Sequence, residues 1–291
     1  MKIPILGTGL SGMVGSRIVE LLSDKYEFAD LSFNTRIDIT SVDQVLEVFK
    51  NSEAATVLHL AAKTDVDSCE DDKILTEEGP AWLVNVEGTR NIVEAAQKYH
   101  KRVIYISSDF VFDGTEDFYT EEDVPNPVNW YGVTKYEGEK ILEESGISHT
   151  IVRLAYPYRA NFPLKSDFVR RIIEAGKENE EIKSLTDHFF TPTFIDDFAK
   201  ALDILLQKEL PGIFHLVGSQ TLTPYEAVGE VFETFGLQGN IIPITRAEYF
   251  RNRAFRPCRL ALKNDKITKL GASMCSFAEG LIELKKQLKE Q

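Results

Sequence analysis

The sequence predicts an α/β protein in which a doubly wound parallel sheet is joined to a smaller C-terminal lobe. In the first half of the chain, short apolar runs alternate with segments of helical periodicity, a pattern typical of βαβ units. A glycine-rich turn follows the first apolar run and opens the first helical segment. Beyond residue 154 the alternation becomes less regular, which indicates a second, smaller unit.

The regular part is expected to contain five strands and four helices. The strands are Lys2–Leu6, Glu27–Leu31, Thr56–Leu60, Val103–Ser107 and Thr150–Leu154, and the helices are Met13–Leu22, Val42–Asn51, Asn85–Tyr99 and Tyr131–Glu143. Buried strands that alternate with helices imply a parallel sheet that is covered on both faces.

The glycine-rich turn, Gly7-Thr8-Gly9-Leu10-Ser11-Gly12-Met13-Val14-Gly15, indicates a dinucleotide site of the Rossmann type. At such a turn, backbone amides and the positive end of a helix face a diphosphate. Gly9 permits the tight turn, Gly12 lets phosphates approach the backbone, and Gly15 lets the helix pack closely. The predicted cofactor contacts are Gly9, Leu10, Ser11, Gly12, Met13 and Val14. The alternative is an ordinary glycine-rich turn.

The end of the second strand bears on the choice between NADP and NAD. NAD sites place an acid at this strand tip, whereas NADP sites offer a basic or hydroxyl group. The tip is expected near Ser32 and Asn34, with Arg36 close behind and Asp30 inside the strand, so NADP is favoured. A strand that ends two residues earlier would place Asp30 at the tip and favour NAD.

The less regular part is expected to hold further helices and strands. The helices are Asp167–Ala175, Ile195–Leu206, Pro224–Phe235 and Ser276–Leu288, and the strands are Gly212–Val217 and Asn240–Ile244. We assign residues 1–154 and roughly 190–217 to an NAD(P)-binding Rossmann domain, and roughly 155–189 and 218–291 to a substrate-binding lobe. Asp196 and Asp197 are interpreted as caps of their helix.

Composition limits the function classes. The 291 residues are 43% hydrophobic, enough for a substantial core. A net charge of -13 opposes a role on nucleic acid or at an anionic membrane. Cys69, Cys258 and Cys275 lack metal or disulfide spacing, so a reducing cytoplasm is expected. The N-terminus turns glycine-rich before it reaches the length of a signal peptide or membrane span.

A tyrosine and a lysine four residues apart predict proton-transfer chemistry. Tyr131 and Lys135 share one face of the expected helix. An ammonium beside a phenol stabilises phenolate, so Tyr131 can give a proton to a carbonyl oxygen. Upstream, Ser107 and Ser108 end a strand at the edge where ligands bind in α/β sheets. Chance residues on a solvated helix and an ordinary serine turn are the alternatives.

The chain resembles the extended short-chain dehydrogenase/reductases, and among them the dTDP-4-dehydrorhamnose reductase family, almost from end to end. The residues that carry the resemblance are the glycine turn, Leu60 to Asp67, Asn85-Val86-Glu87-Gly88-Thr89, Ser107-Ser108-Asp109-Phe110-Val111-Phe112-Asp113-Gly114, Asn129 to Lys135, Asp187 to Thr193, and Arg256-Pro257. The resemblance implies an oxidoreductase that reduces a 4-keto group on a nucleotide-linked sugar of dTDP-rhamnose biosynthesis.

The resemblance also implies residue roles. Ser108, Tyr131 and Lys135 would be catalytic. The further cofactor contacts would be Asp38, Ile39, Leu60, Ala61, Ala62, Lys63, Asn85, Ser107, Tyr131 and Lys135. The substrate contacts would be Thr64, Val66, Ser108, Asp109, Phe110, Tyr156 and Arg256. For Arg256, a structural salt bridge is the alternative to a phosphate contact.

Departures from the family pattern leave the sugar open. The segment from Ser68 to Pro80 is longer than expected, and Leu260-Ala261-Leu262-Lys263 lacks an expected hydroxyl group. Arg17 stands where some members carry a glutamate of a metal-linked dimer, so no such metal is expected. A homodimer remains compatible with the resemblance.

Two other functions stay open. A sugar-nucleotide epimerase or dehydratase of the same superfamily would cycle its bound cofactor, but such enzymes commonly need another acid or base near the serine. A non-catalytic NAD(P)-binding regulatory subunit would bind a partner enzyme. The complete set of Ser108, Tyr131 and Lys135 favours the reductase over both.

Overall fold

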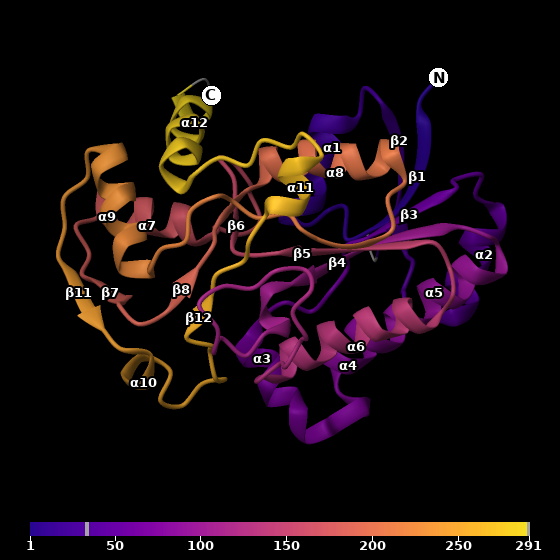
Figure 1. Cartoon of the computed structure of the whole chain (residues 1–291), viewed down its shortest axis with the longest axis horizontal. Helices are drawn as coiled ribbons and strands as arrows, with labels where there is room; N and C mark the ends of the chain where they lie inside the picture. The colour runs from indigo at the N-terminus through magenta and orange to yellow at the C-terminus, as the bar shows by residue number, and fades with distance from the viewer. Residues whose placement is uncertain (33–34, 290–291) are drawn as a thin grey trace.

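A six-stranded parallel sheet forms the centre of the molecule and confirms the α/β class (Figure 1). The computed structural model describes residues 1–32 and 35–289. The strands of the sheet are β1 (Ile3–Thr8), β2 (Tyr26–Leu31), β3 (Thr56–His59), β4 (Arg102–Ser108), β5 (His149–Leu154) and β10 (Gly212–His215). All six were expected from the sequence, and only their ends differ, by one or two residues.

Helices cover both faces of this sheet (Figure 1). One face carries α1 (Met13–Leu22) and α8 (Ile195–Lys208), and the other carries α2 (Val42–Asn51), α5 (Gly88–Lys98) and α6 (Trp130–Glu144). Successive strand residues point to opposite faces, so Ile104 packs with α1 and α8 while Tyr105 packs with α2, α5 and α6. Both faces are therefore buried, as the apolar strand runs predict.

The strand order reverses its direction beside β1. The order across the sheet is β10-β5-β4-β3-β1-β2, with every neighbouring pair parallel. The chain leaves β1 toward β2 on one side and returns to β3 on the other. In open α/β sheets, ligands bind at the carboxyl ends of the strands where the order reverses in this way.

The helix expected at Asn85–Tyr99 begins with an irregular turn. The chain forms α3 (Val66–Asp72), the 3-10 helix η2 (Lys73–Glu78) and α4 (Pro80–Trp82) before a π-helical turn, η3 (Leu83–Glu87), leads into α5. The long segment from Ser68 to Pro80 is thus mostly helical. Single π turns inside helices frequently occur at functional sites, and η3 contains Asn85.

Three helices away from the main sheet form a third core. It is built from α7 (Phe168–Lys177), α9 (Pro224–Phe235) and α12 (Phe277–Lys289). Small two-stranded sheets pair β11 (Ile241–Ile244) with β7 (Ile182–Leu185), β12 (Arg259–Leu260) with β8 (Phe189–Phe190), and β6 (Pro157–Tyr158) with β9 (Thr193–Phe194). The short helices are η4 (Asp109–Val111), α10 (Arg246–Tyr249) and α11 (Asp265–Lys269). None of the helices described is long and apolar enough to cross a bilayer.

A buried ion pair joins α6 to the sheet. Arg153 on β5 donates from Nε to Glu139 Oε1 at 3.0 Å and from Nη2 to Glu139 Oε2 at 2.7 Å. Both side chains are 1% exposed. Glu139 lies one turn after Lys135, so this pair holds the part of α6 that carries the predicted catalytic residues. Breaking one member leaves an uncompensated buried charge.

We therefore expect Glu139→Ala to lower the free energy of unfolding by about 3–5 kcal/mol, because Arg153 would lose its buried counter-charge. Urea denaturation measures this change. The control is Glu143→Ala at an exposed position of the same helix, with an expected change within about 0.5 kcal/mol. Equal stabilities of the two variants would show that the pair does not hold α6.

Candidate active site

The glycine turn has the backbone geometry that a diphosphate needs. Gly9 has φ +69, a conformation that favours glycine. A Cβ on Gly9 would lie 2.8 Å from the amide nitrogen of Ala61, and one on Gly15 would collide with the carbonyl oxygen of Gly9. Gly12 is the N-cap of α1. The turn thus lies against the segment after β3 and leaves the start of α1 accessible to an anion.

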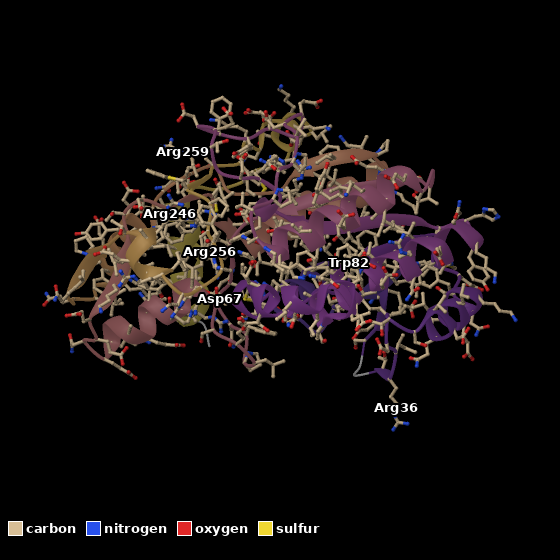
Figure 2. The ribbon with its side chains drawn as sticks, turned by 90° about the horizontal axis from the view of Figure 1, so that it is seen from below. Arg36, Asp67, Trp82, Arg246, Arg256 and Arg259 are labelled. Carbon is tan, nitrogen blue, oxygen red and sulfur yellow. The ribbon has the colours of Figure 1, made fainter. Side chains whose placement is uncertain are left out.

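The end of β2 lies where the sequence predicts it. Asp30 is the next-to-last residue of the strand, and Ser32 follows its end. Ser32 Oγ donates to Asp30 Oδ2 at 2.8 Å. Arg36 is exposed, with φ +62, and projects away from the body of the molecule (Figure 2). Asn34 lies outside the described residues.

The next predicted cofactor contacts follow β2 and β3 in the chain. Ile39 is buried against Gly88 at the start of α5, where a Cβ would lie 2.7 Å from Ile39 Cδ1. Asp38 accepts from the amide of Thr40 at 2.9 Å and so orders the start of α2. Leu60, Ala61 and Ala62 follow β3 directly. They and the glycine turn therefore line one edge of the sheet.

Lys63 and Asn85 are tied to each other. The Lys63 amide donates to Asn85 Oδ1 at 2.7 Å, and Asn85 Nδ2 donates to the Lys63 carbonyl at 3.0 Å. The Lys63 ammonium instead turns to Asp72 and the Ser68 carbonyl. Its side chain thereby anchors α3, a role that the sequence did not indicate.

The predicted catalytic residues lie at the carboxyl end of β4. Ser108 is its last residue, and Phe110 donates its backbone N–H to Ser108 Oγ at 3.2 Å. Tyr131 and Lys135 on α6 are both buried. The Tyr131 ring meets that of Phe110 edge-on at 5.7 Å, and Lys135 Nζ lies 4.0 Å from the centre of the Tyr105 ring on β4. Two close contacts, between Gly132 and the Phe110 carbonyl and between Gly138 and the Tyr105 hydroxyl, leave no room for side chains and let α6 approach β4.

Burial dominates the protonation of this site. It raises the pKa of Tyr131, while the nearby Ser108 hydroxyl opposes the shift. Burial lowers the pKa of Lys135 to about 7, and the Glu139 carboxylate opposes that shift. Tyr131 is thus a neutral phenol that can donate a proton. The Ser107 hydroxyl is buried, with no hydrogen-bond partner among the described residues, so it is available to a ligand.

Several predicted substrate contacts pack together. Val66 and Tyr156 lie against the buried cluster that contains Phe110 and Tyr131. Tyr156, with φ +40, hydrogen-bonds through its hydroxyl to His188 Nε2 at 2.8 Å. Nδ1 of His188 lies 2.8 Å from the Pro257 carbonyl, so it donates there, and Nε2 accepts from Tyr156. Thr64 is exposed two residues before Val66.

Arg256 already has a counter-ion. Its Nη2 lies 2.9 Å from Asp67 Oδ1 on α3, and its Nη1 donates to the Ala254 carbonyl at 2.7 Å. Its guanidinium lies 4.9 Å from the centre of the Phe250 ring. Figure 2 shows Arg256 beside Asp67, with Arg246 nearby. The contact joins the late part of the chain to α3, beside the cluster that contains Val66.

A hydrogen-bond chain that the sequence did not reveal connects these groups. The Ala61 amide donates to Thr8 Oγ1 at 3.0 Å, and Thr8 Oγ1 lies 2.6 Å from His59 Nδ1. His59 Nε2 lies 3.0 Å from Thr89 Oγ1, which donates to the Asn85 carbonyl at 2.7 Å. These bonds assign the proton of His59 to Nε2. No sequence spacing signals such contacts, because they join three segments that lie far apart in the chain.

The chain of contacts continues to the proton donor. Asn85 Nδ2 donates to Thr134 Oγ1 at 2.9 Å, and Thr134 Oγ1 donates to the Tyr131 carbonyl at 2.8 Å. The turn beside the predicted diphosphate and the residue predicted to deliver a proton thus belong to one polar network.

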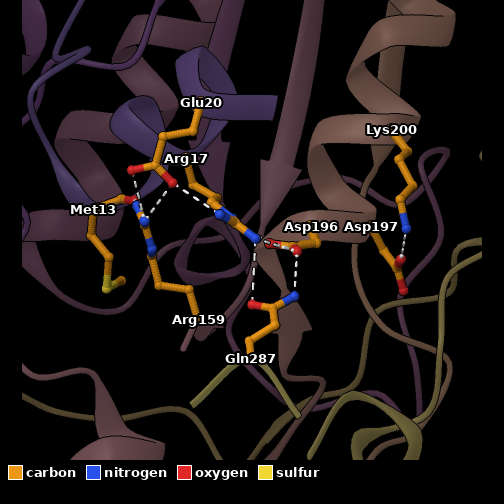
Figure 3. A network of polar contacts seen from close by, with 8 residues as sticks. All are labelled: Met13, Arg17, Glu20, Arg159, Asp196, Asp197, Lys200 and Gln287. Carbon is orange, nitrogen blue, oxygen red and sulfur yellow. Dashed lines mark hydrogen bonds and ion pairs between the residues drawn. The ribbon is translucent and has the colours of Figure 1, made fainter. Parts of the chain in front are cut away.

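Arg17 lies in a second network, which joins α1 to the start of α8 and to α12 (Figure 3). Its Nε donates to Asp196 Oδ1 at 2.7 Å and its Nη2 to Asp196 Oδ2 at 2.6 Å, while Gln287 Nε2 donates to the same carboxylate at 2.8 Å. Asp197 Oδ2 accepts from the Cys275 amide at 3.1 Å. The capping interpretation of this acidic pair was therefore wrong, because tertiary partners take both carboxylates. In the described part of the chain, no three His, Cys, Asp or Glu residues are arranged to hold a metal ion.

The parallel sheet, the glycine turn and the serine, tyrosine and lysine at the end of β4 define an NAD(P)-dependent oxidoreductase with a Rossmann-type fold. The model of the RmlD substrate binding domain matches residues 1–290. The chain belongs to this family.

Several known proteins are similar to this chain in sequence or in structure. dTDP-4-dehydrorhamnose reductase of Escherichia coli is 32% identical over 79% of this chain and 77% of its own length. Methionine adenosyltransferase 2 subunit beta of Rattus norvegicus is 27% identical over 92% of this chain and 82% of its own length. The crystal structure of dTDP-4-dehydrorhamnose reductase from Bacillus anthracis in complex with NADP has a TM-score of 0.90 and 29% identity, covering 99% of this chain and all of that one.

The hydrogen-bond chain through His59 predicts a specific pH dependence of stability. Burial, reinforced by the Lys135 charge, lowers the pKa of His59 from 6.5 to about 3. The native state therefore binds fewer protons than the unfolded state between these pH values. The stabilisation is complete above pH 6.5 and is lost as the pH falls toward 3.

We expect His59→Gln to lower the free energy of unfolding at neutral pH by about 1–3 kcal/mol. The difference in free energy of unfolding between the wild type and His59→Gln should decrease below pH 6.5 by about 1.4 kcal/mol per pH unit. Urea denaturation between about pH 7 and pH 5 measures it. His100→Asn, at an exposed position, should follow the wild type at each pH. A pH-independent gap for His59→Gln would contradict the assigned neutral imidazole.

Proposed function

We propose that this protein is an NADPH-dependent reductase of a nucleotide-activated 4-keto sugar, with dTDP-4-dehydrorhamnose as the preferred candidate substrate. The observation that carries the proposal is the convergence of Ser108, Tyr131 and Lys135 at the carboxyl end of β4, on the sheet edge that also bears the glycine turn. The NADP-bound relative and the reductases among the similar proteins support the cofactor and the substrate class.

In the proposed reaction, bound NADPH supplies hydride to the keto carbon. Tyr131 gives its phenolic proton to the keto oxygen, and Ser108 orients that oxygen by a hydrogen bond. A protonated Lys135 stabilises the phenolate that forms, and Glu139 favours this charge on the lysine. Burial of the three groups excludes water and strengthens each interaction.

The proposed cofactor contacts are those predicted from the sequence. The turn from Gly9 to Val14 would hold the diphosphate, and Ser32 and Arg36 would lie near the 2′-phosphate. Asp38 and Ile39 would flank the adenine. Leu60 to Lys63, Asn85 and Ser107 would line the nicotinamide half, where the unpartnered Ser107 hydroxyl supports a ligand contact. Thr64, Val66, Phe110 and Tyr156 would surround the sugar, and their packing around Tyr131 supports this.

The division into domains is also part of the proposal. Residues 1–154 and roughly 190–217 would form the NAD(P)-binding domain, and they contain all six strands of the main sheet. Roughly 155–189 and 218–291 would form the substrate-binding lobe. We further propose a cytoplasmic homodimer without nucleic-acid or membrane partners. Free thiols at Cys69, Cys258 and Cys275 suit a reducing compartment, and light scattering would test the dimer.

The first test is Tyr131→Phe, which removes only the proton donor. We expect kcat to fall by about 10²–10⁴-fold while NADPH affinity is unchanged. The assay follows the loss of reduced-nicotinamide absorbance with dTDP-4-dehydrorhamnose. Tyr136→Phe is the matched control on the same helix and should keep wild-type turnover. Full turnover by Tyr131→Phe would contradict the role of Tyr131 as the proton donor.

The assay also separates the rival functions. Turnover without net NADPH oxidation, with tightly held cofactor, would identify an epimerase. Binding of NADPH without turnover of any keto sugar, together with stable co-purification of a larger enzyme, would identify a regulatory subunit. The relative named as a methionine adenosyltransferase subunit gives this last alternative a specific basis.

Arg256 provides a second test. A guanidinium can bind a substrate phosphate in place of Asp67, and a charge-assisted hydrogen bond contributes about 1.5–3 kcal/mol. We therefore expect Arg256→Ala to raise KM about 10–100-fold with little change in kcat, and Asp67→Asn to lower KM by freeing the arginine. Arg259→Ala is the control. If both Arg256→Ala and Asp67→Asn raise KM alike, the pair is only structural.

A further inference from the structure

A buried carboxyl group that the proposed proton transfer does not use lies beside its serine. Asp109 is the first residue of η4 and is 2% exposed. Its Oδ1 accepts a hydrogen bond from Ser108 Oγ at 2.9 Å. Its Oδ2 is buried and has no hydrogen-bond partner in residues 1–32 and 35–289. A half-satisfied buried carboxyl group is unfavourable unless it has a function or a missing partner.

The Ser108 hydroxyl has one proton to donate, and both Asp109 and the keto oxygen of the substrate require it. A serine hydroxyl donates one hydrogen bond and accepts others. Ser108 Oγ accepts from the Phe110 amide at 3.2 Å, and its own proton points to Asp109. A keto oxygen carries no proton and needs a donor. An ionised Asp109 therefore competes with the substrate for the one proton that Ser108 can offer.

We propose that Asp109 is a positioning residue that must be protonated for Ser108 to donate to the keto oxygen of the substrate. The carboxyl O–H of Asp109 then donates to Ser108 Oγ, and the serine O–H turns toward the ketone. The proton of Asp109 stays in place throughout, and the proton of the product comes from Tyr131. This inference rests on the proposed reductase function.

The surroundings of Asp109 favour the neutral acid. Burial raises its pKa to about 7, while the hydrogen bond from Ser108 and the nearby backbone amides of Asp109 and Phe110 oppose the shift. The facing ionisable groups are the phenols of Tyr131 from α6 and Tyr156 after β5, and burial keeps both neutral by raising their pKa values. The ionisable groups next to these phenols are Cys69 of α3, near Tyr131, and Arg256, near Tyr156. Lys135 lies on the same helix as Tyr131.

The main test replaces the carboxyl group with an amide. In Asp109→Asn the side-chain NH₂ donates to Ser108 Oγ at every pH, as the protonated acid does. Because Lys135 must also stay protonated, kcat/KM of the wild type should fall by more than about tenfold per pH unit once both groups lose their protons. Asp109→Asn should keep the low-pH rate within about threefold and should fall only about tenfold per pH unit, as Lys135 loses its proton. Asp109→Ala should be about 10²-fold slower at every pH, because Ser108 is no longer oriented.

Lys135 requires a matched comparison, because burial lowers its pKa to about 7 as well. The deciding measurement is therefore the difference between the pH profile of kcat/KM of the wild type and that of Asp109→Asn. A decrease in kcat/KM at high pH that is shallower or absent in Asp109→Asn supports the inference. A decrease identical to that of the wild type overturns it. Asp113→Asn makes the same chemical change at a carboxylate whose pKa four hydrogen bonds lower to about 2 despite its partial burial. This control should keep the wild-type profile.

Infrared spectroscopy tests the proton without turnover. At about pH 6 the wild type should show the carbonyl stretching band of a protonated carboxylic acid, which disappears as the pH rises through the pKa of Asp109. The band should be absent from Asp109→Asn and should shift when aspartate is carboxyl-labelled. If the protein reduces no keto sugar, the proposed function fails while the band still reports on Asp109. If Asp109→Asn does not fold, the labelled wild type decides, and a missing band overturns the inference.

Discussion

The hydrogen-bond chain through His59 is the constraint on which the arrangement of the site depends. It begins at Thr8, at the end of β1, and crosses β3 and α5 to reach Asn85. From Asn85 it continues through Thr134 to the backbone of Tyr131. Because each member has a buried donor or acceptor to satisfy, a shift of one segment would leave a polar group unpaired. The predicted cofactor turn and the predicted proton donor are thereby held in one register.

The same burial that rigidifies the site sets its chemistry. A sheet covered on both faces leaves ionisable groups at its carboxyl edge in a medium of low polarity. The charged form is then unfavourable for acids and bases alike, so the pKa of Asp109 rises and that of Lys135 falls. The ion pair of Glu139 and Arg153 places a compensating charge one turn below Lys135. Perturbed groups of this kind cluster at functional sites.

Contacts of Ala254 and Arg256 join the C-terminal part of the chain to α3 beside the predicted catalytic residues. Arg256 and Ala254 both bond to Asp67, so the late segment is joined to α3 directly beside the cluster that contains Val66, Phe110 and Tyr131. Lys63 and Asp72 anchor α3 in turn. The intact serine, tyrosine and lysine set favours an enzyme over a regulatory subunit.

The sequence by itself determined the fold class, the six strands of the main sheet and the glycine turn, because apolar periodicity and backbone freedom are local properties. It also placed Ser107 and Ser108 at a strand end and Tyr131 and Lys135 on one helix face, and the family resemblance selected Ser108. Only the tertiary structure decided the strand order, the π turn at Asn85 and the partners of His59, Asp67, Asp109 and Asp196. Contacts between segments far apart in the chain depend on how the elements pack, and neither composition nor spacing records that.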